Sequence, residues 1–318
     1  MSPRLEVINL KSYFFTRSGL VKAVDDVSFS IDAGETLALV GESGCGKSMT
    51  ALSLLRLLPE PGRVVNGEIK LSGRDVLRLP DIEMRRIRGN EISMIFQEPM
   101  TSLNPVLRIG EQIAEVLQLH EGHSEQQALD KAAELLTQVG ISDPRRRLRE
   151  YPHQLSGGQR QRIMIAMALA CDPQLLIADE PTTALDVTIQ AQIMDLLQQL
   201  KTERQMATLL ISHDLGVVAG NADRVAIMYA GQIVETGSVE QLFSNPLHPY
   251  TLGLLNCIPK AGQKGPLATI PGQLPRVKEH FDGCLFLERC DTPCPPCGHK
   301  PPQLIEIEPG HQVRCWRY

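Results

Sequence analysis

The chain has 318 residues, of which 42% are hydrophobic and 22% charged. This is the composition of a globular protein with a sizeable core, and it excludes a disordered or collagen-like chain. The 32 lysines and arginines are outnumbered by 37 aspartates and glutamates, and this net charge of −5 excludes a strongly basic surface for nucleic acid. Only 4% of the residues are aromatic, which disfavours a carbohydrate cleft or a base-stacking surface built on aromatic rings.

Apolar runs in the sequence are short. The longest, Ile163–Cys171, falls well below the roughly 18 residues needed to span a bilayer. The first residues also lack an apolar signal segment. We therefore expect a cytosolic protein that reaches a membrane only through its partners.

The predicted elements alternate between strand and helix along the chain. The first 70 residues contain short β-like runs, among them Val24–Ile31 and Glu35–Val40. A helix is predicted from Lys47 to about Leu58, where prolines follow. Further helices are predicted within 110–140, over 157–169 and over 189–204, and further strands over 175–178, 207–212 and 225–229. This alternation predicts an α/β fold with a largely parallel, helix-covered sheet.

The composition changes near residue 245, where prolines and cysteines become frequent and hydrophobic periodicity fades. We predict two domains, residues 1–245 and 246–318. The second is too rich in loops to hold much core of its own, so it needs a staple, a partner or the first domain for stability. Within it, Tyr250–Leu255 could form one short helix.

Residues 41–48 read Gly-Glu-Ser-Gly-Cys-Gly-Lys-Ser, follow a predicted strand and precede a predicted helix. Small residues let successive backbone N–H groups curl around a phosphate, and the helix N-terminus adds partial positive charge. Lys47 would reach the β- and γ-phosphates, and the Ser48 hydroxyl would ligate Mg²⁺. Cys45 either fills space or responds to redox state, and filling is the favoured interpretation. The predicted nucleotide contacts here are Gly41, Ser43, Gly44, Cys45, Gly46, Lys47, Ser48 and Met49.

Two further motifs complete the predicted nucleotide site. The apolar strand at 175–178 ends in Asp179, a candidate Mg²⁺ ligand, and Glu180, which could polarise the attacking water. After Leu155, a helix N-terminus offers a second anion site. One chain cannot readily use both sites on one nucleotide, but two chains facing head to tail could each lend the second site to the other's ATP. The residues of this second site are Ser156, Gly157, Gly158 and Gln159.

With these motifs in this order, residues 5 to about 240 resemble the ATPases of ABC transporters. The resemblance implies a P-loop NTPase domain with a mixed sheet core and a helical subdomain at about 98–170. It also implies that Gln97 senses Mg²⁺ and contacts a membrane subunit, and that His213 contacts the γ-phosphate. Ala184, Leu185 and Asp186 would form the loop that crosses the dimer interface, and Phe14 or, less favourably, Tyr13 would stack on adenine. The implied catalytic residues are Lys47, Gln97, Glu180 and His213, and the implied Mg²⁺ ligands are Ser48, Gln97 and Asp179.

Three longer segments are similar to the ATPases of dipeptide and oligopeptide importers: residues 96–105 (FQEPMTSLNP), 151–154 (YPHQ) and 248–251 (HPYT). In that group the last segment opens a C-terminal extension. The resemblance implies a peripheral ATP hydrolase on the cytoplasmic face of the inner membrane. Its implied partners are two transmembrane permease subunits, a second ATPase subunit and an extracytoplasmic substrate-binding protein, with no nucleic acid.

The function has alternatives at this stage. The same machinery could import a nickel chelate, glutathione, an opine or an antimicrobial peptide instead of dipeptides or oligopeptides. A soluble ABC ATPase acting on nucleic acid, or an iron–sulfur sensor with an inactive ATPase, would be a different class of protein. The acidic net charge disfavours the soluble ATPase that acts on nucleic acid. The iron–sulfur sensor is disfavoured because the residues expected of an active ATPase are intact, namely Lys47, Asp179, Glu180 and His213.

Five of the eight cysteines, Cys284, Cys290, Cys294, Cys297 and Cys315, fall within the last 35 residues. In a reducing compartment such clustering indicates metal chemistry before disulfides. Four thiolates can hold a [4Fe–4S] cluster or Zn²⁺, and the spacing lacks the two separate short knuckles typical of zinc. The importer family's pattern matches all but Cys294, and relatives with this tail can carry a [4Fe–4S] cluster. Zn²⁺, free thiols and disulfides remain alternatives, with Cys294 a spare thiol or an alternate ligand.

Overall fold

The computed structural model describes residues 3–97, 102–182, 185–258, 269–275 and 282–318. The chain divides into two compact units. The first contains the described residues up to Ile31, Thr36–Leu77 and Leu210 onward, and the second contains Asp32–Glu35 and Arg78–Leu209. The N-terminal and C-terminal parts of the chain therefore fold together in one unit.

An antiparallel sheet in the first unit has the strand order β2-β1-β4-β5. Phe14 lies opposite Val21 on one side and Gly62 on the other. The sequence pattern predicted only short β-like runs here, but the strands are long and form a sheet of their own. They are β1 (Leu5–Thr16), β2 (Gly19–Ile31), β4 (Gly62–Leu71) and the short β5 (Arg74–Asp75).

The first unit also contains a second sheet, with the strand order β11-β12-β10-β9-β3. Within it β3 and β9 are parallel, whereas β9–β10, β10–β12 and β11–β12 are antiparallel. The prediction of a largely parallel sheet is therefore wrong for this unit, because β10 and the C-terminal hairpin extend the sheet in the antiparallel direction. The strands are β3 (Thr36–Val40), β9 (Arg224–Tyr229), β10 (Gln232–Ser238), β11 (Ile305–Glu308) and β12 (His311–Val313).

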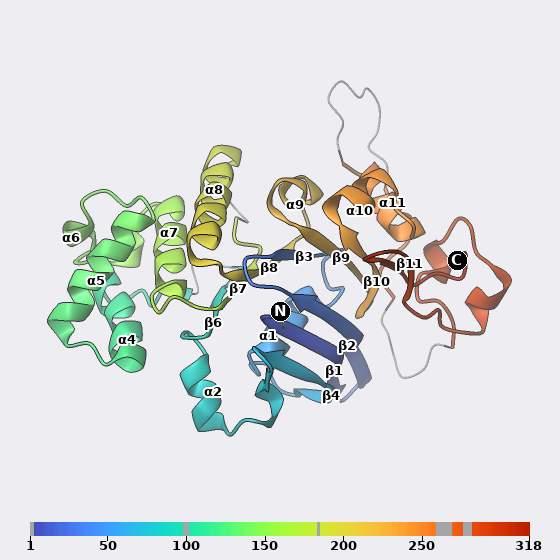
Figure 1. Cartoon of the computed structure of the whole chain (residues 1–318), viewed down its shortest axis with the longest axis horizontal. Coiled ribbons are helices and arrows are strands. Elements are labelled where there is room, and N and C mark those ends of the chain that lie inside the picture. The colour runs from blue at the N-terminus through green and yellow to red at the C-terminus, as the bar shows by residue number, and fades with distance from the viewer. Residues whose placement is uncertain (1–2, 98–101, 183–184, 259–268, 276–281) are drawn as a thin grey trace. The chain divides into compact units, whose positions relative to one another are not determined.

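Helices pack on both faces of this mixed sheet. The helix α1 (Lys47–Leu54) contacts β1, β2 and β4 of the antiparallel sheet. It ends at Leu54 rather than at the predicted Leu58, because Arg56 adopts the left-handed conformation with φ of 52° before the prolines are reached. The helices on the opposite face are α9 (Leu215–Asn221), α10 (Val239–Ser244) and α11 (Pro249–Asn256), as Figure 1 shows. The last contains the short helix predicted at 250–255.

A buried aromatic cluster joins the C-terminal residues to the mixed sheet. The Tyr229 ring of β9 lies 4.7 Å from the Tyr250 ring of α11 and 5.2 Å from the Phe286 ring, measured between centroids. Tyr229 and Tyr250 are fully buried. Edge-to-face pairs of this kind contribute about 0.5–1.5 kcal/mol each beyond the burial of their area. The cluster is therefore a main attachment of the C-terminal region.

The carboxylate of Glu235 in β10 provides a second attachment. It is fully buried and accepts hydrogen bonds from the backbone N–H groups of Leu247 and His248, each at 2.8 Å. Its Oε1 also lies 2.8 Å from Nε2 of the buried His311 in β12. A buried carboxylate is tolerated only when hydrogen-bonded in this way. Residues 246–318 thus rely on the first unit for their stability, and the domain boundary at 245 stays a prediction.

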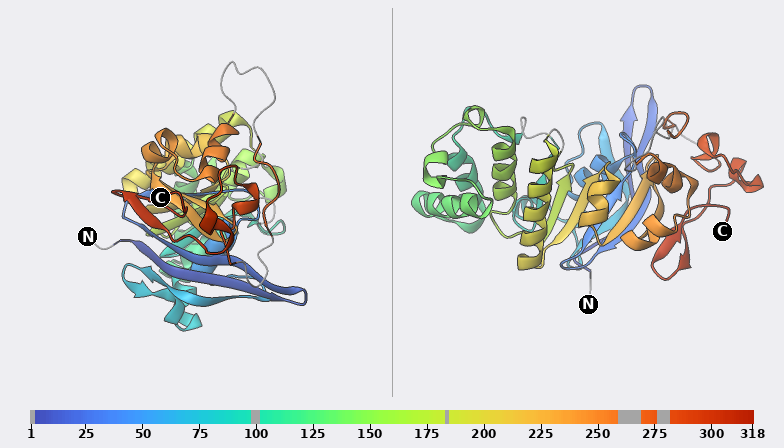
Figure 2. Two further views of the ribbon diagram at one scale, coloured as in Figure 1. Left: turned by 90° about the vertical axis from the view of Figure 1, so that its right-hand side faces the viewer. Right: turned by 90° about the horizontal axis from the view of Figure 1, so that it is seen from above.

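The second unit is mostly helical. Its strands β6 (Ile92–Ile95) and β7 (Leu175–Asp179) are parallel and adjacent, with β8 (Ala207–Ser212) next to β7, and the division between the units falls within β8. The predicted helical stretch at 110–140 is two helices, because Gly122 adopts a left-handed φ of 70° and Ser124 caps the second helix. The helices α4, α5 and α7 pack together (Figure 2). The helices are α2 (Asp81–Ile87), α4 (Ile109–Glu121), α5 (Glu125–Gln138), α6 (Pro144–Arg147), α7 (Gly157–Ala168) and α8 (Val187–Arg204).

Across the ranges that the structure describes, none of the helices combines the length and the apolar character needed to cross a bilayer. This agrees with the short apolar runs of the sequence.

The buried His248 predicts a specific acid sensitivity. Burial lowers its pKa from 6.5 to about 3, and its Nδ1 accepts a hydrogen bond from the Tyr250 N–H, a role that requires the neutral ring. Because the unfolded state binds the proton more tightly, stability is complete above pH 6.5 and falls as the pH drops toward 3. Between pH 7 and pH 5 this one group should remove about 2 kcal/mol from the free energy of unfolding.

The substitution His248→Asn tests this, because asparagine can accept the same capping hydrogen bond but cannot titrate. Urea unfolding at pH 7 and pH 5 should show that the variant loses about 2 kcal/mol less stability than the wild type over this interval. An identical pH dependence in both proteins would contradict the assignment.

Candidate functional site

The phosphate-loop motif lies between β3 and α1 in the first unit, as predicted. Gly46 directly precedes α1 with φ of 113°, and a Cβ at this position would lie 2.2 Å from the carbonyl oxygen of Ala23. A Cβ at Gly41 would lie 2.2 Å from the carbonyl oxygen of Met228. The loop backbone therefore packs against its neighbours at distances that only glycine permits.

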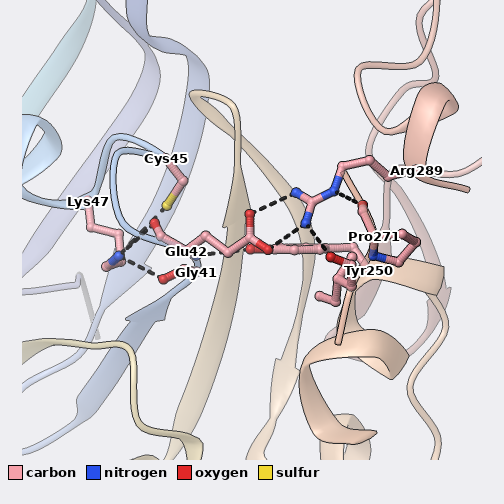
Figure 3. A network of polar contacts seen from close by, with 8 residues as sticks. Gly41, Glu42, Cys45, Lys47, Tyr250, Pro271 and Arg289 are labelled. Atoms are coloured by element: carbon pink, nitrogen blue, oxygen red, sulfur yellow. Dashed lines mark hydrogen bonds and ion pairs between the residues drawn. The ribbon is translucent and has the colours of Figure 1, made fainter. Parts of the chain in front are cut away.

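Lys47 brings a positive charge into this loop. Its side chain is buried, and Nζ donates to the carbonyl oxygens of Gly41 at 2.8 Å and Glu42 at 3.1 Å (Figure 3). Ser48 follows in the first turn of α1 and is half-buried. An ammonium, a hydroxyl and a helix N-terminus in one loop suit a polyphosphate with its metal ion.

Cys45 is buried within the same loop. Burial raises the pKa of its thiol, and the opposing effect of Lys47 is smaller. A thiol with a raised pKa stays protonated and is a poor nucleophile. This favours the space-filling interpretation of Cys45 over a redox role.

Glu42 is held from three directions, and the sequence did not indicate this. Its carboxylate forms a two-pronged ion pair with Arg289, at 2.7 Å and 2.8 Å, and its N–H donates to Oη of Tyr250 at 2.9 Å (Figure 3). Its carbonyl oxygen accepts from Lys47. The ion pair raises the pKa of Arg289. Glu42 and Arg289 are 247 positions apart, so no local spacing could have signalled their contact.

The other predicted nucleotide residues of the first unit lie at strand positions. Phe14 is half-buried, and its ring packs so closely over Gly62 that a Cβ there would lie 2.6 Å from it. The hydroxyl of Tyr13, the less favoured alternative, donates to the Asp25 carboxylate at 2.5 Å. His213 follows β8 directly and is exposed.

In the second unit, the structure brings Gln97 and Glu180 together. Nε2 of Gln97 donates to Oε2 of Glu180 at 2.9 Å. Glu180 follows β7 with φ of 47°, a conformation that a glutamate rarely adopts. Positive φ alone does not mark a functional residue, because nine described non-glycine residues have it. The feature that points to a function for Glu180 is its hydrogen bond with Gln97. Asp179, the last residue of β7, is buried.

The second predicted anion site is a fully formed helix cap. The Ser156 hydroxyl accepts from the N–H of Gln159 at 3.3 Å, and the Gln159 side chain accepts from the N–H of Ser156 at 3.0 Å. This capping box fixes Gly157 and Gly158 in the first turn of α7. A Cβ at Gly158 would lie 3.1 Å from Ile189, so close packing also favours glycine there.

Asp186 also stabilises a helix N-terminus, which the motif around it does not indicate. It is the N-cap of α8, and its carboxylate accepts from the Ile189 N–H at 2.9 Å. The preceding Ala184 of the predicted interface loop lies outside the described residues, as does part of the 96–105 segment. The predicted nucleotide residues thus fall into two sets, one in each compact unit.

The C-terminal cysteines lie within electrostatic range of one another. Burial raises the pKa of Cys284 to about 11, and the neighbouring thiols Cys297, Cys315 and Cys290 add to the rise. The N–H of Cys284 donates to the carbonyl oxygen of Cys297 at 2.7 Å. None of the eight cysteines, all of which lie in the described ranges, forms a disulfide. In the described part of the chain, no three histidine, cysteine or acidic side chains converge closely enough to hold a metal ion as they lie.

Comparison with known proteins identifies the family. Residues 24–183 match the family model described as ABC transporter, and residues 234–297 match the oligopeptide/dipeptide transporter C-terminal region. A probable peptide ABC transporter ATP-binding protein of Sinorhizobium fredii is 53% identical, covering 98% of this chain and 94% of its own. The oligopeptide transport ATP-binding protein AppD of Bacillus subtilis is 52% identical, covering 100% and 98%.

Among solved structures, the chain is similar to a dimeric, post-hydrolysis structure of the ATP-binding cassette MJ0796 with ADP and Pi. The TM-score is 0.67 at 28% identity, covering 74% of this chain and 98% of that one. The chain therefore belongs to the ATP-binding proteins of ABC transporters, in the group that carries the oligopeptide/dipeptide transporter C-terminal region.

Proposed function

We propose that this chain is the ATP-hydrolysing subunit of a membrane importer of dipeptides or oligopeptides. The observation that carries the proposal is the phosphate loop with its buried Lys47, in a chain that shares half of its residues with peptide-transport ATPases along its whole length. Peptides are preferred over nickel chelates, glutathione, opines or antimicrobial peptides because the relatives named above are described as peptide or oligopeptide transport proteins.

The residues of the two sets have complementary chemistry toward MgATP. Gly41, Ser43, Gly44, Cys45, Gly46, Lys47, Ser48 and Met49 bind the phosphates, and Phe14 stacks on the adenine. The Ser48 hydroxyl, the Asp179 carboxylate and the Gln97 amide are oxygen donors of the kind that Mg²⁺ prefers. When bound, the ion neutralises phosphate charge. Its proposed ligands fit that chemistry.

Glu180 is the proposed base for the attacking water, and Gln97 is its orienting partner. The 2.9 Å hydrogen bond between Nε2 of Gln97 and Oε2 of Glu180 orients the carboxylate that would accept the proton of the attacking water. His213, exposed at the end of β8, is the proposed contact to the γ-phosphate.

The capped helix at Ser156–Gln159 and the region around Asp186 are proposed to complete the nucleotide site of a second ATPase chain, with the two chains facing head to tail.

Transmembrane permeases are the proposed partners of the second unit, at the cytoplasmic face of the membrane. Phe96, next to Gln97, and Val106 support this because these apolar side chains are 42% and 75% exposed. An extracytoplasmic binding protein would deliver the peptide to the permeases.

Glu180→Gln should retain ATP binding but slow turnover by about 100-fold or more, because the amide cannot accept the proton from water. The variant assembled with its permeases should also hold MgATP in a stable ATPase dimer. Phosphate release and gel filtration with MgATP measure the two effects.

Glu203→Gln is the matched control, since Glu203 is an exposed residue of α8 in the same unit and its carboxylate accepts a hydrogen bond from Gln199 on the same helix. Its turnover should equal that of the wild type. Unchanged turnover in Glu180→Gln would remove Glu180 from the role of base. A wild-type assembly that releases no phosphate would reject the proposed function.

We also propose that Cys284, Cys290, Cys297 and Cys315 hold a [4Fe–4S] cluster whose role is structural. Two observations support the donor set: Cys297, Cys315 and Cys290 lie close enough to Cys284 to add to the rise in its pKa, and the segment that carries them has little core beyond the Tyr229 cluster. Metal binding coupled to folding would stabilise such a segment. The thiols would have to move from their present positions to converge on a cluster.

Anaerobically purified wild-type protein should be brown and contain about four iron and four sulfide per chain. Cys284→Ser should lose the iron and the sulfide. Cys257→Ser should keep them, because Cys257 lies outside the five-cysteine segment 284–315. Retention of iron in Cys294→Ser would make Cys294 the spare thiol. A colourless wild type with one zinc, or with no metal, would reject the cluster.

A further inference from the structure

The phosphate loop contains an acidic residue at a position where an acid is electrostatically unfavourable. Glu42 is the only acidic residue in the motif at 41–48, and it is directly next to Gly41. ATP carries several negative charges, so an uncompensated carboxylate in the loop would weaken its binding. The loop must neutralise Glu42 to bind a polyphosphate well.

The neutralising charge comes from the C-terminal region. The Arg289 side chain is only 5% exposed, and it meets both carboxylate oxygens of Glu42 in parallel hydrogen bonds of 2.7 and 2.8 Å (Figure 3). Its Nε also donates to the carbonyl oxygen of Pro271 at 2.8 Å, and its guanidinium lies 5.7 Å from the Tyr229 ring centroid. These contacts leave the guanidinium little freedom to turn away from Glu42. A partly buried, two-pronged pair of this kind is stronger than a fully exposed ion pair with a single contact.

The same contact restricts the loop backbone. The N–H of Glu42 donates to the buried Tyr250, and its carbonyl oxygen accepts from both Lys47 and the N–H of Cys45. Fixing the Glu42 side chain therefore fixes a peptide unit that contacts Lys47, the proposed phosphate-binding residue. Leu274 also approaches the loop, 4.0 Å from where a Cβ of Gly44 would lie.

We propose that Arg289 is a positioning residue for nucleotide binding, which acts by neutralising and orienting Glu42 within the phosphate loop. The inference rests on the proposed ATP-binding function of this loop. It assigns to the C-terminal region a part in the nucleotide site.

Charge and structure can be separated with four proteins of the full chain: wild type, Arg289→Met, Glu42→Gln and the double variant. Met keeps the apolar stem of the side chain and removes its charge. The dissociation constant for MgATP is measured by displacement of a fluorescent ATP analogue. Arg289→Met should bind about tenfold more weakly, because the carboxylate is left uncompensated.

The double variant should regain most of the lost affinity, although it restores no ion pair, and Glu42→Gln alone should bind at least as tightly as the wild type. A purely structural role predicts the opposite, with the double variant as weak as Arg289→Met. In the assembled transporter, KM for ATP in Arg289→Met should rise about tenfold while kcat changes less than about twofold.

Arg317→Met is the matched control, since it removes the same charge from an exposed arginine whose hydrogen bond goes to Thr292. Its affinity should equal that of the wild type. Should Arg289→Met not fold, Arg289→Lys gives the same comparison: a single ammonium cannot make both bonds, so affinity should fall about threefold and return when Glu42→Gln is added.

Wild-type affinity in Arg289→Met, or failure of Glu42→Gln to rescue it, would overturn this inference alone. A wild type that binds no MgATP would reject the proposed function instead.

Discussion

The buried carboxylate of Glu235 is the constraint on which the C-terminal half of the first unit depends. It lies in β10 and binds the N–H groups of Leu247 and His248 at one end of the C-terminal region and His311 near the other. A polar group as deeply buried as the Glu235 side chain is tolerated only if all its hydrogen-bond partners are in place. We therefore expect the three contacts to form and to break together. This makes the attachment of the C-terminal region cooperative with the sheet.

That attachment determines what surrounds the phosphate loop. With His248 fixed, α11 begins at Pro249, and the Tyr250 hydroxyl receives the N–H of Glu42. Tyr250 and Tyr229 in turn pack against Phe286, three residues before Arg289. A continuous set of contacts therefore leads from β10 to the phosphate loop. The C-terminal region belongs to the environment of the loop and is not merely a separate appendage.

The sequence predicted those features whose signals are local. The loop at 41–48, the capped helix beginning after Ser156 and the strand ending at Asp179 are each encoded in a few consecutive residues, and the structure has the corresponding elements there. The long β1 was less visible because its register with β2 shifts between Val7 and Leu10 and again between Ser12 and Tyr13. Such irregularities break the alternation of apolar and polar residues that identifies a strand.

Local sequence signals could not predict two contacts of the site, because each depends on how distant segments of the chain meet. These are the pairing of Glu42 with Arg289 and that of Gln97 with Glu180. They also show why the net charge of −5 says little about affinity for an anion. At physiological ionic strength charges are screened over about 8 Å, so the charges inside a site outweigh the total. Within the phosphate loop Glu42 is compensated by Arg289, and under the proposed function this leaves the charge of Lys47 to act on the phosphates. An acidic protein can thus present a locally cationic loop, provided that its C-terminal region remains docked.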